Sequence, residues 1–264
     1  MTASTSYFSK SLEKGLKILA LFNRETPTLS QTEIASLVDL NMTSTYRYIN
    51  TLVEMGYLEK DETTKRVRPS IFCLAFCNNL MRATDHNRFI KALVDDVHSR
   101  CNITIDVALS VDDDMMRIYH REAADTLTYS LPDFTRNCLH NTALGKAFLS
   151  SLPADELQSR VANLQMTAKT ERTIVDRDVL KNQLLLAKAR KYAMTVEEFL
   201  PSLIAIAAPL INPHTGKGIG AVSFDFSVLQ RSPEEVEVQY APLIVELAAK
   251  ISATIPVEGR LGSV

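Results

Sequence analysis

Three groups of side chains in this sequence of 264 residues have types and spacings that could do chemistry. The first group lies in TSTYRYINTL, residues 43–52, where hydroxyls and one guanidinium cluster at what reads as the start of a helix. Base edges in the DNA major groove are read by the N-terminal residues of such a helix, and arginine can bridge guanine O6 and N7 or hold a phosphate. We therefore expect DNA contacts from the outward-facing residues of this segment: Thr43, Ser44, Thr45, Arg47 and Tyr48. Tyr46 has a stronger claim as a core residue.

The second group lies in LHNTALGK, residues 139–146. The Gly145–Lys146 pair suggests a phosphate-binding loop, but the required earlier glycine is missing and Ala147 follows the lysine, so nucleotide hydrolysis is not expected. A helix that starts near Asn141 or Thr142 would leave backbone N–H groups free to hold a carboxylate. This predicts an effector site at the helix start: Asn141, Thr142, Ala143, Leu144 and Gly145. The alternative is a helix packed closely on a sheet without any ligand.

The third group is the pair Cys138 and His140, which supports an enzymatic alternative. Residues two apart on an extended segment share a face, so a thiol and an imidazole could meet there. Nucleophile and base usually come from distant segments, which makes this spacing weak support for catalysis. The remaining cysteines, Cys73, Cys77 and Cys101, form no CxxC pair, and we expect neither a metal nor a cofactor.

Elements that could position the first group are visible around it. A helix is expected over 11–22, with Ser11 as its cap. Ser30 and Glu33 form a capping-box pattern that opens another helix. A further helix, with Thr43 or Ser44 as its cap, follows after a short break and ends near Gly56. Two short helices joined in this way indicate a helix-turn-helix. The turn-rich stretch 57–70 then reads as a two-stranded wing, whose basic residues are expected on phosphates: Lys65, Arg66 and Arg68. A merely solvated hairpin is the alternative.

The second half of the chain predicts helices around an antiparallel sheet. Helical patterns cover 71–83 and 87–101, strands are expected over 103–111 and 115–122, and a strong hairpin spans 202–228. An entry loop followed by a helix is expected within 137–153. Further helices are expected over 154–164, 178–192 and 234–255, the last one broken or bent near Pro242. This organisation gives an α+β fold with a DNA-binding domain over 1–70, a linker helix over 71–86 and a ligand domain over 87–264.

Composition limits the classes of protein that remain. At about 150 residues per domain the length suggests two domains, and 46% hydrophobic with 23% charged residues is ordinary for a globular chain. The net charge of −2 argues against a general nucleic-acid coat, although a local basic patch can still bind. Without a membrane-spanning run or a secretory signal, we expect a cytoplasmic protein that does not contact membranes.

Several motifs together resemble the IclR family of bacterial transcriptional regulators. They are SLEKGLKILALF, the pair SQTEIASLVDL and TSTYRYINTLVEMGYL, then LHNTALGKAFLSSLP, and the hairpin AIAAPLINPHTGKGIGAVSFDFS. The resemblance covers about residues 10–256, and LHNTALGKA is its most specific part. It implies a winged helix-turn-helix, a linker helix and a GAF-like effector domain. It also implies a homodimer or dimer of dimers on a palindromic, double-stranded operator, which represses or activates a catabolic or metabolic operon.

The resemblance further implies an effector pocket that extends over the strands, with a small organic acid as effector. We expect these additional lining residues: Thr195, Leu203, Ala205, Ser223 and Asp225. The chain departs from the family pattern at Ile204 and Ala205, where an Arg-Cys pair is common, and at Thr195 and Asp225. Because an ionised Asp225 would repel a second acidic group, we favour a small hydroxy or amino acid, aromatic acids included, over a dicarboxylate.

Overall fold

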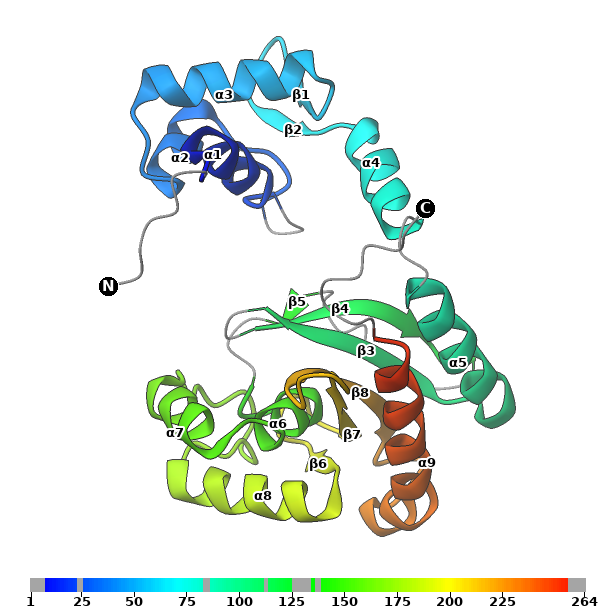
Figure 1. Ribbon diagram of the computed structural model, residues 1–264. Coiled ribbons are helices and arrows are strands. Elements are labelled where there is room, and N and C mark those ends of the chain that lie inside the picture. Colours follow the sequence, from blue (N-terminus) through cyan, green and yellow to red (C-terminus); the bar gives the residue numbers. More distant parts are fainter. Residues whose placement is uncertain are drawn as a thin grey trace. The chain divides into compact units, whose positions relative to one another are not determined.

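The computed structural model describes residues 8–22, 26–82, 86–111, 114–124, 134–135 and 139–255. The chain divides into two compact units, residues 1–84 and 85–264, and each is described by itself. Figure 1 shows the helices and strands of both.

The first unit is a winged helix-turn-helix. It contains α1 (Lys10–Leu19), α2 (Gln31–Leu37), α3 (Met42–Glu54), the antiparallel strands β1 (Leu58–Lys60) and β2 (Val67–Pro69), and α4 (Ile71–Arg82). Ser30 and Glu33 form the predicted capping box at the start of α2. The apolar faces of the helices meet in one small core, which includes Ile18, Ile34 and Ile49.

Two helix starts differ from the sequence expectation because residues further upstream provide the caps. Asn41, and not Thr43 or Ser44, caps α3 and accepts a hydrogen bond from the Ser44 N–H at 2.8 Å. Ser9 rather than Ser11 caps α1. Each shift moves the helix start by one turn or less, which is within the usual uncertainty of helix ends.

The second unit is built on a six-stranded antiparallel sheet with the order β5-β4-β3-β8-β7-β6. Its strands are β3 (Thr104–Val111), β4 (Asp114–Arg121), β5 (Phe134–Thr135), β6 (Ala193–Val196), β7 (Leu203–Ile211) and β8 (Gly218–Ser227). The expected hairpin is β7–β8. β5 and β6 are short strands that the sequence pattern did not predict.

Helices cover both faces of this sheet (Figure 1). On one face α5 (His86–Cys101) and α9 (Pro233–Ala253) pack on large side chains such as Ile105, Val222 and Phe224. On the other face lie α6 (Ala143–Ser150), α7 (Ala154–Asn163) and α8 (Arg177–Arg190). α9 continues through Pro242 without the predicted break. The arrangement confirms the predicted α+β class with an antiparallel sheet.

Small residues bring α6 close to its side of the sheet. The strand positions beneath it are mostly alanine, among them Ala108, Ala205 and Ala221. Gly145 approaches the preceding loop so closely that a Cβ there would lie 2.4 Å from the Leu139 Cα. Since no larger residue fits without a backbone shift, the start of α6 is held firmly against the sheet.

Candidate functional site

The start of α3 presents part of the predicted DNA-reading surface. Thr43 and Arg47 are exposed, and Ser44 is half-buried at the first turn. Tyr46 is also exposed (48%), and its ring lies 5.7 Å from the Lys60 ammonium, so the expected core position for Tyr46 is wrong. The outward face of α3 therefore includes an aromatic ring that the sequence pattern had assigned to the interior.

Thr45 does not belong to that outward face. It is fully buried, and its hydroxyl donates to the Asn41 carbonyl oxygen at 3.0 Å. The expectation that Thr45 contacts DNA is contradicted because this side chain lies on the same face of α3 as Ile49 and Leu52, which pack in the core. Tyr48 is half-buried and packs against the core of the first unit, so it does not point outward either.

Three basic residues of the wing, Lys65, Arg66 and Arg68, are held in ion pairs near the surface. Arg66 contacts Glu33 at 3.0 Å, Arg68 contacts Glu59 at 3.0 Å, and Lys65 contacts Glu62 at 3.3 Å. Arg66 also donates to the hydroxyl and the carbonyl oxygen of Thr28. Exposed pairs of this kind contribute little free energy, so these cations can exchange a carboxylate for a phosphate at low cost.

In the second unit a pocket lies between the start of α6 and the sheet. The cavity itself measures about 30 Å³, far below the roughly 300 to 1,000 Å³ found for small-molecule sites. Eight of the ten predicted effector residues line it: Thr142, Ala143, Leu144, Thr195, Leu203, Ala205, Ser223 and Asp225.

Two predicted residues, Asn141 and Gly145, are not among the residues that line this pocket. Gly145 serves the close approach of α6 to Leu139 instead. Asn141 is fully buried, and neither its Nδ2 nor its Oδ1 has a hydrogen-bond partner within the described part of the chain. Four further lining residues were missed by the sequence reading: Asp106, Ala108, Arg117 and Phe199.

The start of α6 has the donors that an anion needs. Thr142 caps the helix by accepting from the Gly145 N–H at 3.1 Å. The N–H groups of Ala143 and Leu144, one and two residues into the helix, have no acceptor within it. Together with the helix dipole they favour a negatively charged group at this end of the pocket.

The opposite wall carries two carboxyl groups and one guanidinium. Asp106 on β3 is 1% exposed, and its Oδ1 lies 3.2 Å from Arg117 Nη1 and 2.9 Å from His120 Nδ1. Burial, and next the charge of Asp106, raise the pKa of Asp225 well above its usual range. Asp225 is 8% exposed and lies in the pocket wall, and its raised pKa favours the protonated form, which can donate a hydrogen bond.

One signal for Asp106 was present in the sequence. The run ITIDVALSV places a single acidic residue inside an otherwise apolar strand, and such a charge is rarely buried unless it is paired. Its partner Arg117 lies on the next strand, at a position that only the β3–β4 register brings close.

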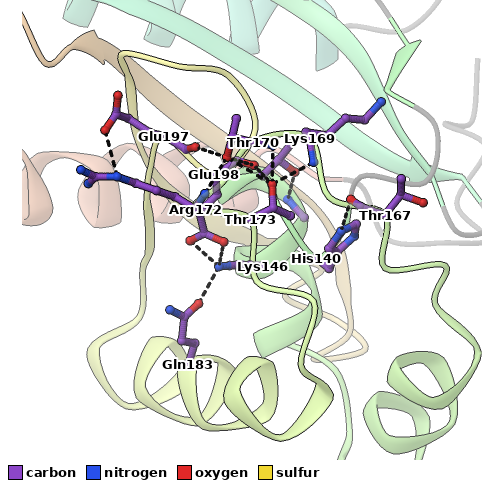
Figure 2. A network of polar contacts seen from close by, with 12 residues as sticks. His140, Lys146, Thr167, Lys169, Thr170, Arg172, Thr173, Gln183, Glu197 and Glu198 are labelled. Carbon is purple, nitrogen blue, oxygen red and sulfur yellow. Dashed lines mark hydrogen bonds and ion pairs between the residues drawn. The ribbon is translucent and has the colours of Figure 1, made fainter.

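A buried ion pair holds the segment beside the pocket (Figure 2). Lys146 on α6 is 2% exposed, and its Nζ donates to Glu198 Oε1 and Oε2 at 2.7 and 2.6 Å and to Gln183 Oε1 of α8 at 2.5 Å. Burial lowers the pKa of Lys146 and raises the pKa of Glu198, and the attraction between the two charges opposes both shifts. The pair ties α6 to the 197–202 connection between β6 and β7.

The same connection is fastened from a second side, as Figure 2 shows. The hydroxyls of Thr170 and Thr173 donate to the carbonyl oxygens of Glu197 and Glu198, each at 2.6 Å. Arg172 pairs with the Glu197 carboxylate at 3.2 Å. Phe199, the next residue along, lines the pocket, so this network fixes one of the pocket's walls.

The residues of the enzymatic alternative are only partly described. Cys138 lies outside the described residues. His140 is fully buried, its Nε2 lies 3.1 Å from the Thr167 carbonyl oxygen, and burial lowers the pKa of the ring. The imidazole is thus engaged with the backbone of the loop that also fastens the 197–202 connection.

None of the helices in the described part of the chain combines the length and the apolar character needed to cross a membrane. The same residues contain no group of three or more histidine, cysteine, aspartate or glutamate side chains arranged to hold a metal ion.

A winged helix-turn-helix in one unit and a pocket at a helix start in the other are typical of one class of protein, the ligand-responsive DNA-binding regulators. Two family models match the chain, the IclR helix-turn-helix domain over residues 11–62 and the bacterial transcriptional regulator IclR C-terminal domain over residues 80–253. The chain therefore belongs to the IclR family of transcriptional regulators, which confirms the resemblance seen in its motifs.

Two transcriptional regulators are similar to this chain over most of its length. The chain is 25% identical to the transcriptional regulator BhcR of Paracoccus denitrificans over 245 residues, which cover 92% of this chain and 86% of that protein. It is 25% identical to the transcriptional repressor AllR of Klebsiella pneumoniae, with 94% and 90% covered.

Solved structures share the fold across nearly the whole chain. An IclR regulator from Alicyclobacillus acidocaldarius aligns with a TM-score of 0.80 at 20% identity, and 94% of this chain and 99% of that chain are covered. An IclR homologue from Microbacterium hydrocarbonoxydans, solved in complex with 4-hydroxybenzoate, aligns with a TM-score of 0.71 at 16% identity, and 92% and 98% are covered.

Proposed function

We propose that this regulator binds a small organic acid in the pocket at the start of α6 and that binding changes its affinity for operator DNA. The observation that carries the proposal is the juxtaposition of helix N–H donors, which favour a carboxylate, with a polar wall across the same cavity. A hydroxy or amino acid, aromatic acids included, matches that wall. The relative solved with 4-hydroxybenzoate is consistent with such a ligand.

On the DNA side we propose that Thr43, Ser44, Arg47 and Tyr46 form the reading face of α3. Lys65, Arg66 and Arg68 then contact phosphates from the wing. Contacts of the first kind carry sequence preference, whereas contacts of the second kind position the protein. The regulated genes would be a catabolic or metabolic operon, with either repression or activation as the outcome.

We propose that two copies bind a palindromic operator, as a homodimer or a dimer of dimers. One helix-turn-helix per chain reads one half-site, so a symmetric partner is needed for full affinity. A suitable contact surface is α4, an apolar helix that directly follows the wing and exposes Ile71, Leu74 and Leu80. We place the DNA-binding domain at residues 1–70, the linker helix at 71–86 and the effector domain at 87–264.

The effector proposal is tested by filling the pocket. In the variant Ala143→Phe the added ring occupies the space beside the helix start, so 4-hydroxybenzoate and related acids should no longer raise the unfolding temperature. Operator affinity in the absence of acid should stay at the wild-type value. Ala205→Leu fills the same pocket from β7 and should also abolish binding of the acids. Loss of binding in both variants would show that the filled pocket, and not a local disturbance of α6, is the cause.

If both variants bind the acids as tightly as the wild-type chain does, the effector site must lie elsewhere. Catalysis through Cys138 and His140 remains the rival function, and it predicts that an acid is converted during incubation. We expect each acid to be recovered unchanged.

A further inference from the structure

One wall of the pocket offers an acceptor that the protein itself leaves unused. Asp106 uses its Oδ1 for Arg117 and His120. Its Oδ2 is buried, has no hydrogen-bond partner among the described residues, and belongs to a residue that lines the cavity. A buried acceptor without a donor costs free energy, so a molecule that supplies a donor there gains affinity.

A second unused atom lies directly beside it. In the β3–β8 register Asp106 stands opposite Ser223, so the two side chains share the pocket face of the sheet, with Cβ atoms about 5 Å apart. Ser223 is 1% exposed, and its Oγ also has no partner within the described residues. One donor-bearing group of a ligand can therefore meet both oxygens.

We propose that Asp106 is the specificity-determining residue of this pocket and selects acids that carry a hydroxyl or a protonated amine at the end opposite their carboxylate. The inference rests on the proposed function, in which the ligand's carboxylate lies at the start of α6. A dicarboxylate is disfavoured because its far end cannot donate to Asp106 Oδ2 and carries the same charge. Arg117 does not offset this, since its guanidinium is already paired with Asp106 Oδ1.

This assignment differs from the one made on the sequence, which gave the role to Asp225. Asp225 lies two residues beyond Ser223 on β8 and faces the same cavity. Burial, and next the charge of Asp106, raise its pKa. The protonated form of this carboxyl can donate as well as accept, so Asp225 discriminates less between a hydroxyl and a carboxylate. Asp106, held in an ion pair, can only accept.

The test compares acids that differ only at the far end, titrated calorimetrically into the full-length protein. One set is benzoate, 4-hydroxybenzoate and terephthalate, and a smaller set is propionate, 3-hydroxypropionate and malonate. The wild-type chain should bind the hydroxy acid of at least one set about tenfold or more tightly than the matching diacid and the unsubstituted acid. In Asp106→Asn, whose amide can donate, this preference should vanish or reverse, while Asp225→Asn should keep it.

Since Asp106→Asn leaves Arg117 without its partner, the double variant Asp106→Asn/Arg117→Met provides a second route if the single variant does not fold. It too should lose the preference for the hydroxy acid. The assignment would be overturned if the Asp106 variants kept the preference for the hydroxy acid, or if Asp225→Asn lost it to the same extent. In either case the acids would still bind, so the proposed function would stand. If no acid of either set binds the wild-type chain, the proposed effector class falls as well.

Discussion

The buried carboxyl of Asp225 makes the stability of the second unit depend on pH in a definite direction. Its pKa is raised on folding, so the folded chain binds the proton more tightly than the unfolded chain. Its contribution is fully present below the unfolded pKa near 4 and is lost as the pH rises through the folded pKa. We expect Asp225→Asn, which cannot ionise, to gain stability relative to the wild-type chain as the pH rises.

The gain should reach up to about 1.4 kcal/mol for each pH unit in that window. Calorimetric unfolding of both proteins from about pH 5 to pH 8 measures it. Asp178→Asn, a change at an exposed carboxylate in the first turn of α8, serves as the matched control. A constant difference between wild type and Asp225→Asn over this range would show that Asp225 keeps an ordinary pKa.

Substitutions on α3 and on the wing should affect DNA binding in different ways. Arg47→Ala should relax the preference at one base position and cost roughly 1 to 3 kcal/mol on the cognate operator. Arg66→Ala and Arg68→Ala should weaken binding to all sequences alike, and each should reduce the slope of log K against log salt by about one unit.

Salt-dependent fluorescence anisotropy on cognate and scrambled duplexes separates these effects. Arg100→Ala serves as the control, because this exposed arginine lies in the second unit and pairs with Asp96 of the same helix. Identical behaviour of the three variants on both duplexes would argue against the proposed division of roles.

The sequence predicted some residues of the two sites and missed or misplaced others. Three residues of the α6 start line the pocket as predicted, because helix-start motifs are local, and the strand residues were expected from the family resemblance. Thr45 and Tyr46 were assigned to the wrong sides of α3, because the buried face runs through Thr45, Ile49 and Leu52. Asp106 and Arg117 were missed because their meeting depends on strand register, which no local pattern contains.

At the scale of elements, α6 and the 197–202 connection are joined by a buried ion pair whose members depend on each other. Lys146→Met should destabilise the second unit by about 3 to 5 kcal/mol, because Glu198 is then buried without its cation. The double variant Lys146→Met/Glu198→Leu should recover most of this loss, since an apolar pair of similar volume needs no charge compensation. Urea unfolding measures both.

The exposed pair Lys181 and Asp178 on α8 offers the matched control, and Lys181→Met should cost at most about 1 kcal/mol. A single Lys146→Met that unfolds like the wild-type chain would mean that the pair does not stabilise this wall of the pocket. A double variant no better than the single one would point to packing rather than charge as the cause.

Elements with strong internal patterning were predicted well. The capping box of α2, the wing and the β7–β8 hairpin all lie where the pattern indicated. β6 and β5 were not predicted, because strands of four and two residues are too short to show a period. Proline was expected to break α9, but the helix passes through Pro242, where packing on the sheet outweighs the lost hydrogen bond.

At the scale of the whole molecule, we expect protection of two symmetry-related half-sites whose centres lie an integral number of DNA turns apart. Footprinting on the native operator and sedimentation of the complex measure spacing and stoichiometry. Leu74→Glu, placed on the exposed apolar side of α4, should weaken both self-association and operator binding at least tenfold, because a charge is then buried in the contact.

Leu229→Glu provides the control, because Leu229 is similarly exposed but lies in the second unit after β8. It should leave both properties near the wild-type values. Occupation of one asymmetric half-site by a single chain would contradict the symmetric arrangement, whatever the effect of Leu74→Glu.

The strand β3 connects the pocket with the helix that packs on the other face of the sheet. Its alternate side chains face opposite ways, so Asp106 lines the pocket while its neighbours Ile105 and Val107 pack on the far face with Val94 and Val97 of α5. The same backbone therefore carries the pocket residue and the two neighbours that contact α5. α5 is the first helix of the second unit, so only the thickness of one strand separates this helix from the pocket.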